Sequence, residues 1–253
     1  MGICPLRVVE EFCGCAVDRR RKEKSFGETV REILDRLSLF WYKGYGRCPT
    51  DARGLSARDA GQRWERFAFM KTYPLRVAGL DRALPFFPVG GGTFIAGFLM
   101  MGDVELTICC ARALLKKCPL YDVLITPETK SIPLCMEMAR QNGDASYVVA
   151  RKQEKLYMRD VICAEVKSIT TAAPQRLYLD GGDARLLKNR RVLIVDDVIS
   201  TGHSLAAVEK LVVMAGGKVA GRAAVLAEGD AAEREDIVFL ERLPLFTAEE
   251  VSQ

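Results

Sequence analysis

The chain has 253 residues, of which 49% are apolar and 28% are charged, a composition that allows a sizeable buried core. The longest apolar run, 93–102, is about half the roughly 20 residues that span a bilayer, which argues against a membrane protein. The net charge of +4 falls in residues 1–69, and the balanced charge of the remainder argues against a broad nucleic-acid surface there.

The spacing of the cysteines and the single histidine bear on whether the chain binds zinc and on the compartment in which it works. The nine cysteines form no C-x-x-C pair, so a structural zinc site is not expected. No signal-peptide pattern is recognisable at the N-terminus. We therefore expect reduced thiols in a cytoplasmic protein.

Residues 1–69 differ from the rest of the chain. They hold both tryptophans, a basic cluster and many chain breakers. One helix is predicted there, beginning at Ser25, which forms a capping box with Glu28. We expect 1–69 to be a poorly organised, dispensable extension and 70–253 to form the main domain.

From Met70 onward, short apolar runs alternate with amphipathic stretches. The predicted helices cover 104–115, with Asp103 as the N-cap, 131–142 and 204–215. The predicted strands cover 121–126, 146–150, 191–195, 218–227 and 236–240, with a hairpin over 161–170 and 175–179. This order predicts an α/β fold with a mostly parallel, doubly wound sheet, in which ligands bind beyond the carboxyl ends of the strands.

The stretch VLIVDDVISTGHS, residues 192–204, needs a functional explanation. A buried strand runs directly into Asp196 and Asp197, although adjacent carboxylates repel each other. A strand followed by a helix cap explains only one of these acids. A Walker B strand would require the motif G-x-x-x-x-G-K-[ST], which the sequence lacks.

A third interpretation uses every residue of the stretch. The small residues allow the backbone N–H groups of 200–204 to surround a phosphate, and the following helix adds the positive end of its dipole. The two carboxylates can accept hydrogen bonds from the vicinal hydroxyls of a sugar. The stretch is therefore suited to bind a sugar 5-phosphate at both ends.

This stretch resembles the phosphoribosyl-diphosphate (PRPP) motif of type I phosphoribosyltransferases. Residues from about 70 to 246 resemble the adenine phosphoribosyltransferase branch, which implies that core fold with a small hood and a flexible β-hairpin loop. The resemblance implies that Asp196 and Asp197 hold the ribose hydroxyls and serve catalysis. It assigns the 5′-phosphate to Ser200, Thr201, Gly202, His203 and Ser204. His203 stands where the family often has glycine, and we do not expect it to act as a general base.

Two further segments gain meaning from the resemblance. TPETKSIPL, residues 126–134, resembles the pyrophosphate loop, although a simple strand-to-helix turn would also fit. ARKQEKLYM, residues 150–158, resembles the start of the flexible catalytic loop, although it could be a solvated charged turn. Glu154 is the candidate for proton transfer at the base, and Lys155 also serves catalysis. The residues expected near the diphosphate are Glu128, Thr129, Lys130, Ser131, Arg151, Lys152 and Lys155.

The base is expected to lie between the hood and the end of a core strand. Phe86 or Phe87 could pack on a purine, although both could equally belong to a core strand. Glu228 lies where backbone groups could reach the base. Relatives that use hypoxanthine or guanine usually have an acid at the position of Ser200, and a serine cannot transfer that proton near neutral pH. The sequence therefore favours adenine.

The resemblance implies transfer of phosphoribose from PRPP to a purine base, giving a nucleotide such as AMP and pyrophosphate for nucleotide salvage. Mg²⁺ is expected to bind with PRPP near Asp196 and Asp197 and not to protein ligands alone. We expect a homodimer. Two alternatives remain open: a PRPP-sensing transcription regulator, and a xanthine or orotate phosphoribosyltransferase of the same fold. A regulator would need a helix-turn-helix in 1–69, where only one helix is predicted.

Overall fold

The computed structural model describes residues 71–166 and 175–252. The helix predicted from Ser25, the proposed boundary at Met70 and the tip of the predicted hairpin lie outside these residues. Within them, no helix is long and apolar enough to cross a membrane.

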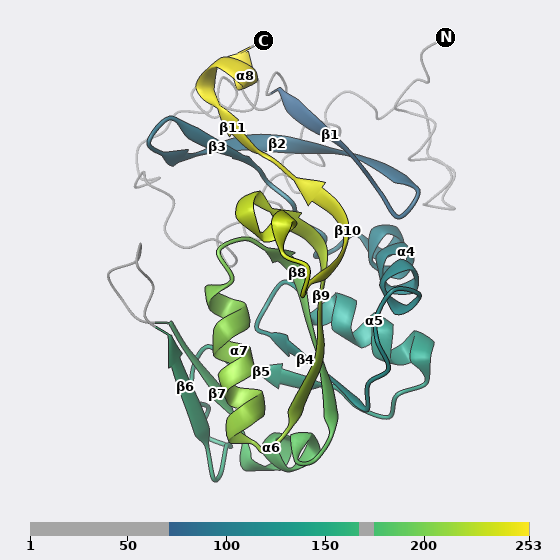
Figure 1. Cartoon of the computed structure of the whole chain (residues 1–253), viewed down its shortest axis with the longest axis vertical. Coiled ribbons are helices and arrows are strands. Elements are labelled where there is room, and N and C mark those ends of the chain that lie inside the picture. Colours follow the sequence, from purple (N-terminus) through teal and green to yellow (C-terminus); the bar gives the residue numbers. More distant parts are fainter. Residues whose placement is uncertain (1–70, 167–174, 253) are drawn as a thin grey trace, which may run out of the picture. The chain divides into compact units, whose positions relative to one another are not determined.

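The centre of the fold is a parallel sheet of five strands in the order β10-β9-β8-β4-β5 (Figure 1). The strands are β4 Val123–Pro127, β5 Val148–Ala150, β8 Arg191–Ile199, β9 Lys218–Glu228 and β10 Val238–Leu243. The central strands are almost continuously apolar because both faces of the sheet are covered. The predicted doubly wound α/β fold is confirmed.

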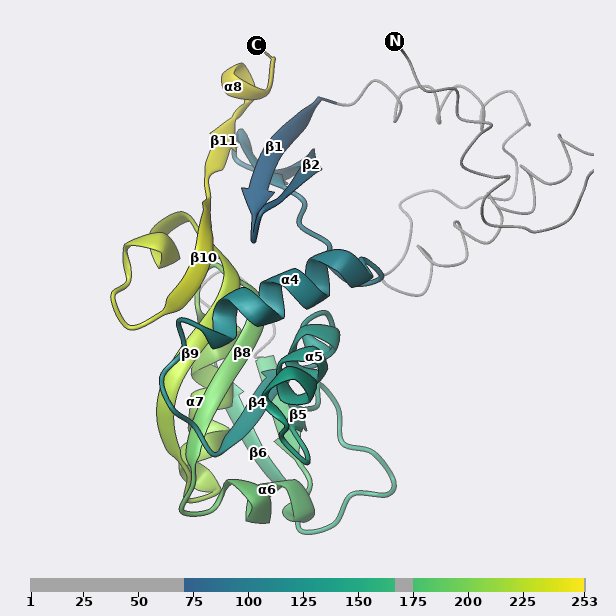
Figure 2. The same cartoon turned by 90° about the vertical axis from the view of Figure 1, so that its right-hand side faces the viewer.

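Helices cover the two faces of this sheet, as Figure 2 shows for α5 and α7. They are α4 Val104–Leu115, α5 Ile132–Asn142 and α7 His203–Met214. Because side chains alternate along a strand, Leu193 and Val195 of β8 pack in the cluster that contains α4 and α5 residues. Val192 and Ile194 pack in the cluster that contains α7 residues.

Two smaller elements flank the core. The predicted hairpin consists of antiparallel strands β6 Ile162–Val166 and β7 Gln175–Leu179. A helix that the sequence did not predict, α6 Gly181–Leu187, begins with two glycines, which read locally as a turn. Its N-cap is Asp180, whose carboxylate accepts a hydrogen bond of 2.8 Å from Gly182 N.

The hood is a four-stranded antiparallel sheet in the order β1-β2-β3-β11. Its strands are β1 Thr72–Val77, β2 Leu80–Gly90, β3 Thr93–Ala96 and β11 Leu245–Thr247. The short helix α8 Ala248–Ser252 follows β11. The chain thus leaves the core sheet at β10 and completes the hood directly afterwards.

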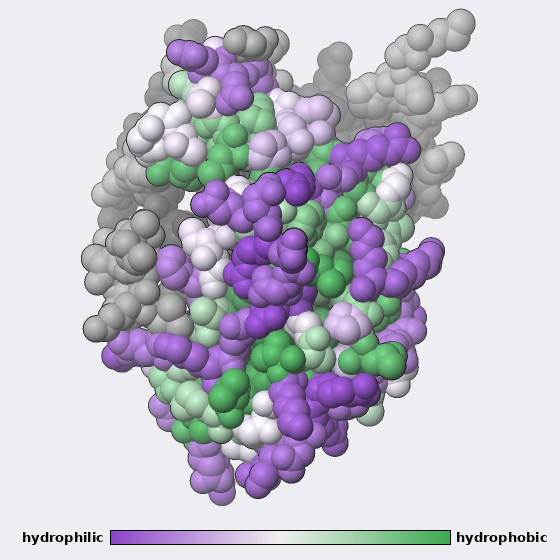
Figure 3. Space-filling view, in the orientation of Figure 1, coloured by the Kyte–Doolittle hydropathy of each residue, from purple (hydrophilic) through white to green (hydrophobic). Residues whose placement is uncertain are grey.

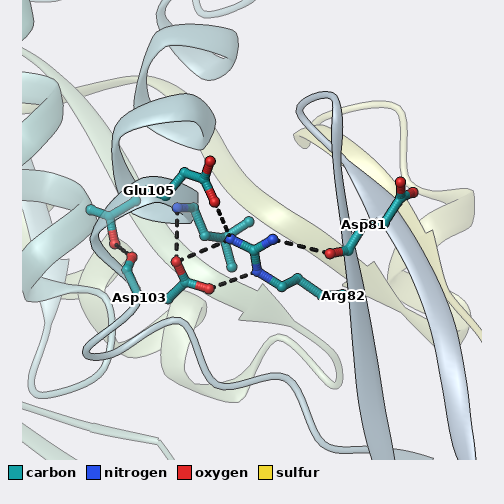
Figure 4. Close-up of polar contacts among 6 residues, drawn as sticks. Asp81, Arg82, Asp103 and Glu105 are labelled. Atoms are coloured by element: carbon teal, nitrogen blue, oxygen red, sulfur yellow. Dashed lines mark hydrogen bonds and ion pairs between the residues drawn. The ribbon is translucent and has the colours of Figure 1, made fainter. Parts of the chain in front are cut away.

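An ion-pair cluster joins the hood to the core (Figure 4). Arg82 of β2 donates to Asp103 from Nε at 2.7 Å and from Nη2 at 3.2 Å. Its Nη2 also donates to Glu105 at 2.9 Å. Asp103 is at the same time the N-cap of α4, because its Oδ1 accepts from Leu106 N at 3.0 Å. One carboxylate therefore caps a core helix and holds a hood strand.

We expect Asp103→Ala to lower the free energy of unfolding by about 2 kcal/mol, measured by urea denaturation. About 1 kcal/mol comes from the lost cap and the rest from the lost hydrogen bonds to Arg82. The matched control is Glu105→Ala, which removes an exposed partner of Arg82 without touching the cap. An equal loss in the two variants would contradict this account.

Candidate active site

Strand β8 carries both aspartates of the PRPP-like motif. The sequence predicted that the strand would end at Val195, but it continues to Ile199, with Asp196 paired to Ala224 of β9. The ladder to β9 keeps these residues extended, which an apolar pattern alone does not reveal. The extension fixes the two acids in a rigid strand, and Asp197 N donates to Asp196 Oδ1 at 2.9 Å.

The structure shows how two adjacent carboxylates are tolerated. Asp197 is only 3% exposed, and its Oδ2 lies 3.2 Å from Lys130 Nζ. Desolvation, together with the neighbouring Asp197 carboxylate, raises the pKa of Asp196 to about 8. Asp197 therefore has a cationic partner, and the raised pKa of Asp196 reflects the cost of placing a second negative charge beside it.

Asp197 Oδ2 could accept a hydrogen bond from a ligand or coordinate a cation. Of the buried side-chain oxygens and nitrogens in the described part of the chain, it alone has no hydrogen-bond partner, although Lys130 lies beside it as a counter-ion. A buried acceptor of this kind is normally satisfied, so its position suits a hydroxyl group or a hydrated cation. No group of three or more metal-ligating side chains occurs among the residues described.

The loop after β8 leads directly into α7. Gly202, the N-cap of α7, has φ +75°, a left-handed conformation that favours glycine. Because glycine has no side chain, the N-cap residue forms no side-chain hydrogen bond to the first N–H groups of α7. Thr201 Oγ1 lies 2.8 Å from His203 Nδ1, which engages the imidazole inside the loop. This end of α7 is suited to an anion.

The predicted pyrophosphate loop joins β4 to α5, and the Glu128–Thr129 peptide bond in it is cis. Lys130 points to Asp197, as described above. Ser131 is 1% exposed, and its hydroxyl is used within the loop, accepting from Thr126 Oγ1 at 2.8 Å and donating to Pro127 O at 3.3 Å. The Ser131 hydroxyl is therefore occupied within the loop, and Lys130 supplies the positive charge of this segment.

Glu128 contacts the next strand and not the PRPP-like motif. Its Oε2 accepts from Lys152 N at 2.9 Å, and its Oε1 lies 3.6 Å from Arg151 Nη1. Arg151 also exchanges backbone hydrogen bonds of 2.9 and 2.8 Å with Tyr178 of β7. Glu128 thus ties the pyrophosphate loop to the beginning of the predicted catalytic loop and holds Arg151 at its edge.

Most of the remaining residues of the predicted catalytic loop lie at the surface, whereas Met158 is buried. Lys152, Glu154 and Tyr157 are exposed, and Lys155 is half-buried. In the part of the chain that the structure describes, none of them has a recorded hydrogen bond or ion pair with Asp196 or Asp197. The structure therefore brings Lys130 to the acids and leaves this segment apart from them.

The two adjacent phenylalanines of β2, Phe86 and Phe87, lie on opposite faces of the strand. Phe86 packs into the hood, edge-on against Phe246 with ring centroids 4.8 Å apart. The ring of Phe87 covers Gly97, where an added Cβ would come within 2.5 Å of it. Because neighbouring residues of a strand point to opposite faces, only one of the two can face a base.

Glu228 lies at the same sheet edge as the acids. It ends β9 one residue after Ala227, which pairs with Ile199 of β8. A cation that the sequence did not predict lies against the loop after β8: Arg234 Nη1 is 3.1 Å from the position of a Cβ built on Gly202. No motif marks Arg234 in the sequence.

The parallel core sheet, the hood and the β6–β7 hairpin define a type I phosphoribosyltransferase fold. Residues 110–244, more than half of the chain, match the family model of the phosphoribosyl transferase domain. The chain therefore belongs to this phosphoribosyltransferase family.

Relatives in the family act on different purines. The chain is 34% identical to a hypoxanthine/guanine phosphoribosyltransferase of Methanocella arvoryzae over 109 residues, 43% of this chain and 53% of the relative. It is 31% identical to an adenine phosphoribosyltransferase of Bifidobacterium animalis subsp. lactis over 146 residues, 56% and 72% of the two chains. The chain spans about half the length of the first of these relatives.

A solved structure shows the same fold. The adenine phosphoribosyltransferase of Saccharomyces cerevisiae, in complex with an imino-altritol bisphosphate and adenine, superposes with a TM-score of 0.50 at 20% identity. The superposition covers 72% of this chain and 98% of the yeast chain. At this identity the likeness concerns the fold alone.

Proposed function

We propose that the protein is a pentosyltransferase that moves 5-phosphoribose from PRPP to a purine base and releases pyrophosphate. The main support for the proposal is that two groups suited to a sugar phosphate lie next to each other where β8 leads into α7. Two adjacent carboxylates, one with a buried unsatisfied oxygen, precede a glycine turn and a helix N-terminus without a side-chain cap. The family and its purine-specific relatives support the same reaction.

Each part of PRPP has a suitable partner in this arrangement. Asp196 and Asp197 accept hydrogen bonds from the ribose hydroxyls. The 5′-phosphate lies against the backbone of 200–204, where the dipole of α7 favours an anion. Lys130, with the backbone of Thr129 and Ser131, faces the diphosphate.

The residues fit a magnesium ion that arrives with the substrate. Asp197 Oδ2 is a buried carboxylate oxygen with no hydrogen-bond partner among the described residues, and carboxylate oxygens are the ligands that Mg²⁺ prefers. When bound, Mg²⁺ neutralises charge on the departing diphosphate. Substrate oxygens and water would supply the other ligands of the ion.

The chain's own contribution is to position and stabilise separating charges. As the bond between ribose and diphosphate breaks, Lys130 can neutralise the leaving group instead of Asp197. Arg151, held by Glu128, supplies a second cation at the edge of the site. Closure of the exposed segment would bring Lys152 and Lys155 to the diphosphate and exclude water.

The base lies under the hood in this proposal. Phe87 is the better candidate for packing on the purine, because Phe86 is used by the aromatic contact with Phe246. Backbone groups near Glu228 face the base from the end of β9. Glu154, brought in by closure, transfers the proton at the ring nitrogen, a role that Ser200 cannot perform near neutral pH.

We expect adenine to be the preferred base. A site that hydrogen-bonds one exocyclic group rejects its analogue strongly, because a buried donor or acceptor is left unpaired. The test offers Mg²⁺, PRPP and one free base at a time, namely adenine, hypoxanthine, guanine, xanthine or orotate, and measures pyrophosphate release. The value of kcat/KM should be highest with adenine.

The alternative outcomes of this assay are distinct. Equal turnover of hypoxanthine and adenine would refute the adenine assignment and keep the purine reaction. Turnover of xanthine or orotate alone would replace the substrate. Tight PRPP binding without turnover of any base would refute the enzymatic proposal and favour a PRPP sensor.

A cytoplasmic location and a homodimeric state are part of the same proposal. The cysteines of the described residues, including the buried Cys110 and Cys135, are free thiols, a state that a reducing compartment would preserve. Light scattering of the purified protein would measure the number of chains in the particle.

A further inference from the structure

Arg234 lies against the loop that is proposed to hold the 5′-phosphate. It follows the short 3₁₀ helix η1, Gly229–Glu233, which connects β9 to β10. A Cβ built on Gly202 would be 3.1 Å from Arg234 Nη1, and within residues 71–166 and 175–252 no other atom beyond the adjacent residues comes within 4 Å of it. The guanidinium is therefore the group packed directly on this glycine.

The orientation of Arg234 is fixed by Asp236. Arg234 donates to this carboxylate from Nε at 2.9 Å and from Nη2 at 2.8 Å, a bidentate pair. Asp236 is itself held by Arg222, whose Nη1 lies 3.4 Å away and which also pairs with Glu209 of α7. One edge of the guanidinium is thus occupied, and Nη1 is the nitrogen that faces Gly202.

The region around η1 and β10 is rich in acidic residues, so a phosphate bound nearby would need a compensating positive charge. Hydrophilic residues gather across the middle of the face in Figure 3, over η1 and β10. Many of them are acidic, namely Asp230, Glu233, Glu235, Asp236 and Glu241. These carboxylates would repel a phosphate, and residues 200–204 contain neither lysine nor arginine.

We propose that Arg234 is an additional ligand of the 5′-phosphate, supplied from outside the PRPP motif. This inference rests on the proposed PRPP site. The Arg234 side chain is 38% exposed, so a bound anion can reach it without rearrangement of the core. Nη1 donates to a phosphate oxygen, and such a charge-assisted bond is stronger than one from a neutral N–H group.

The test is a calorimetric titration of the full chain and of Arg234→Gln. The three probes are Mg²⁺–PRPP, ribose 5-phosphate and Mg²⁺–pyrophosphate, of which the last has no 5′-phosphate. We expect Arg234→Gln to weaken the binding of Mg²⁺–PRPP and of ribose 5-phosphate by a similar factor, on the order of tenfold to a hundredfold. The affinity for Mg²⁺–pyrophosphate should stay unchanged. The matched control is Arg242→Gln, an exposed arginine of β10 that pairs with Glu233 and should bind all three probes normally.

The outcomes separate the inference from its premise. Unchanged affinity of Arg234→Gln for ribose 5-phosphate would overturn it, and so would an equal loss for pyrophosphate, which would indicate a general structural effect. If wild-type protein bound neither PRPP nor ribose 5-phosphate, the proposed function itself would fail. If Arg234→Gln does not fold, Arg234→Lys provides the test, with a smaller loss expected for the same two probes.

Discussion

Asp197→Asn is expected to lower kcat/KM for PRPP by roughly tenfold to more than a hundredfold. Hydrogen bonds to charged groups contribute about 1.5–3 kcal/mol, and each 1.4 kcal/mol corresponds to about a factor of ten. The substitution keeps the shape of a residue that is 3% exposed, so the loss reflects charge and not packing. It removes both the proposed acceptor for a ribose hydroxyl and the counter-ion of Lys130.

Initial rates of pyrophosphate release measure this effect, and Asp196→Asn should act in the same direction. The matched control is Asp81→Asn, an exposed acid of the hood that should leave the rates unchanged. The melting temperature of Asp197→Asn should change little, because the amide keeps the packing of the buried side chain and the lost ion pair involves a Lys130 side chain that is 46% exposed. Wild-type rates in both single variants would rule out the PRPP assignment.

Gly202→Ala should weaken Mg²⁺–PRPP binding by about tenfold or more. At φ +75° a side chain costs roughly 1–2 kcal/mol, and the new Cβ would also be 3.1 Å from Arg234 Nη1. The loop can relieve both penalties only by moving, which would turn its N–H groups away from the phosphate. The measurement is a calorimetric titration alongside thermal unfolding.

Gly216→Ala is the control for backbone strain alone. Gly216 has φ +77° just after the C-terminus of α7, and its nearest neighbour would be 3.5 Å from the added Cβ. This variant should lose a similar amount of stability and keep its PRPP affinity. If the two variants lost PRPP affinity equally, the loop would not be the phosphate site.

The core of the fold was predictable because its signals are local. The N-cap Asp103 and the left-handed Gly143 after α5 mark helix ends in the sequence, and the structure confirms both. The hood was not predictable in the same way. β11 pairs with β3 across about 150 residues of sequence, and β1 contains Pro74, which is tolerated because β1 is an edge strand.

In the site, too, the residues that are neighbours in sequence were predictable, and the contacts between distant segments were not. Asp196, Asp197 and the loop proposed to bind the 5′-phosphate are contiguous, so one stretch of sequence indicates their joint purpose. The contact between Lys130 and Asp197 exists because β4 and β8 are neighbours, and that of Glu128 with Lys152 exists because β4 and β5 are neighbours. Strand order is a property of the whole sheet, which periodicity does not encode.

A crystal structure of the protein with Mg²⁺ and PRPP tests the central claim most directly. We predict that the ribose hydroxyls lie within hydrogen-bonding distance of Asp196 and Asp197, with the 5′-phosphate against the backbone N–H groups that lead into α7. The diphosphate should lie beside Lys130, displaced from its contact with Asp197. Electron density for PRPP at any other place, with the Lys130–Asp197 ion pair intact, would contradict the account.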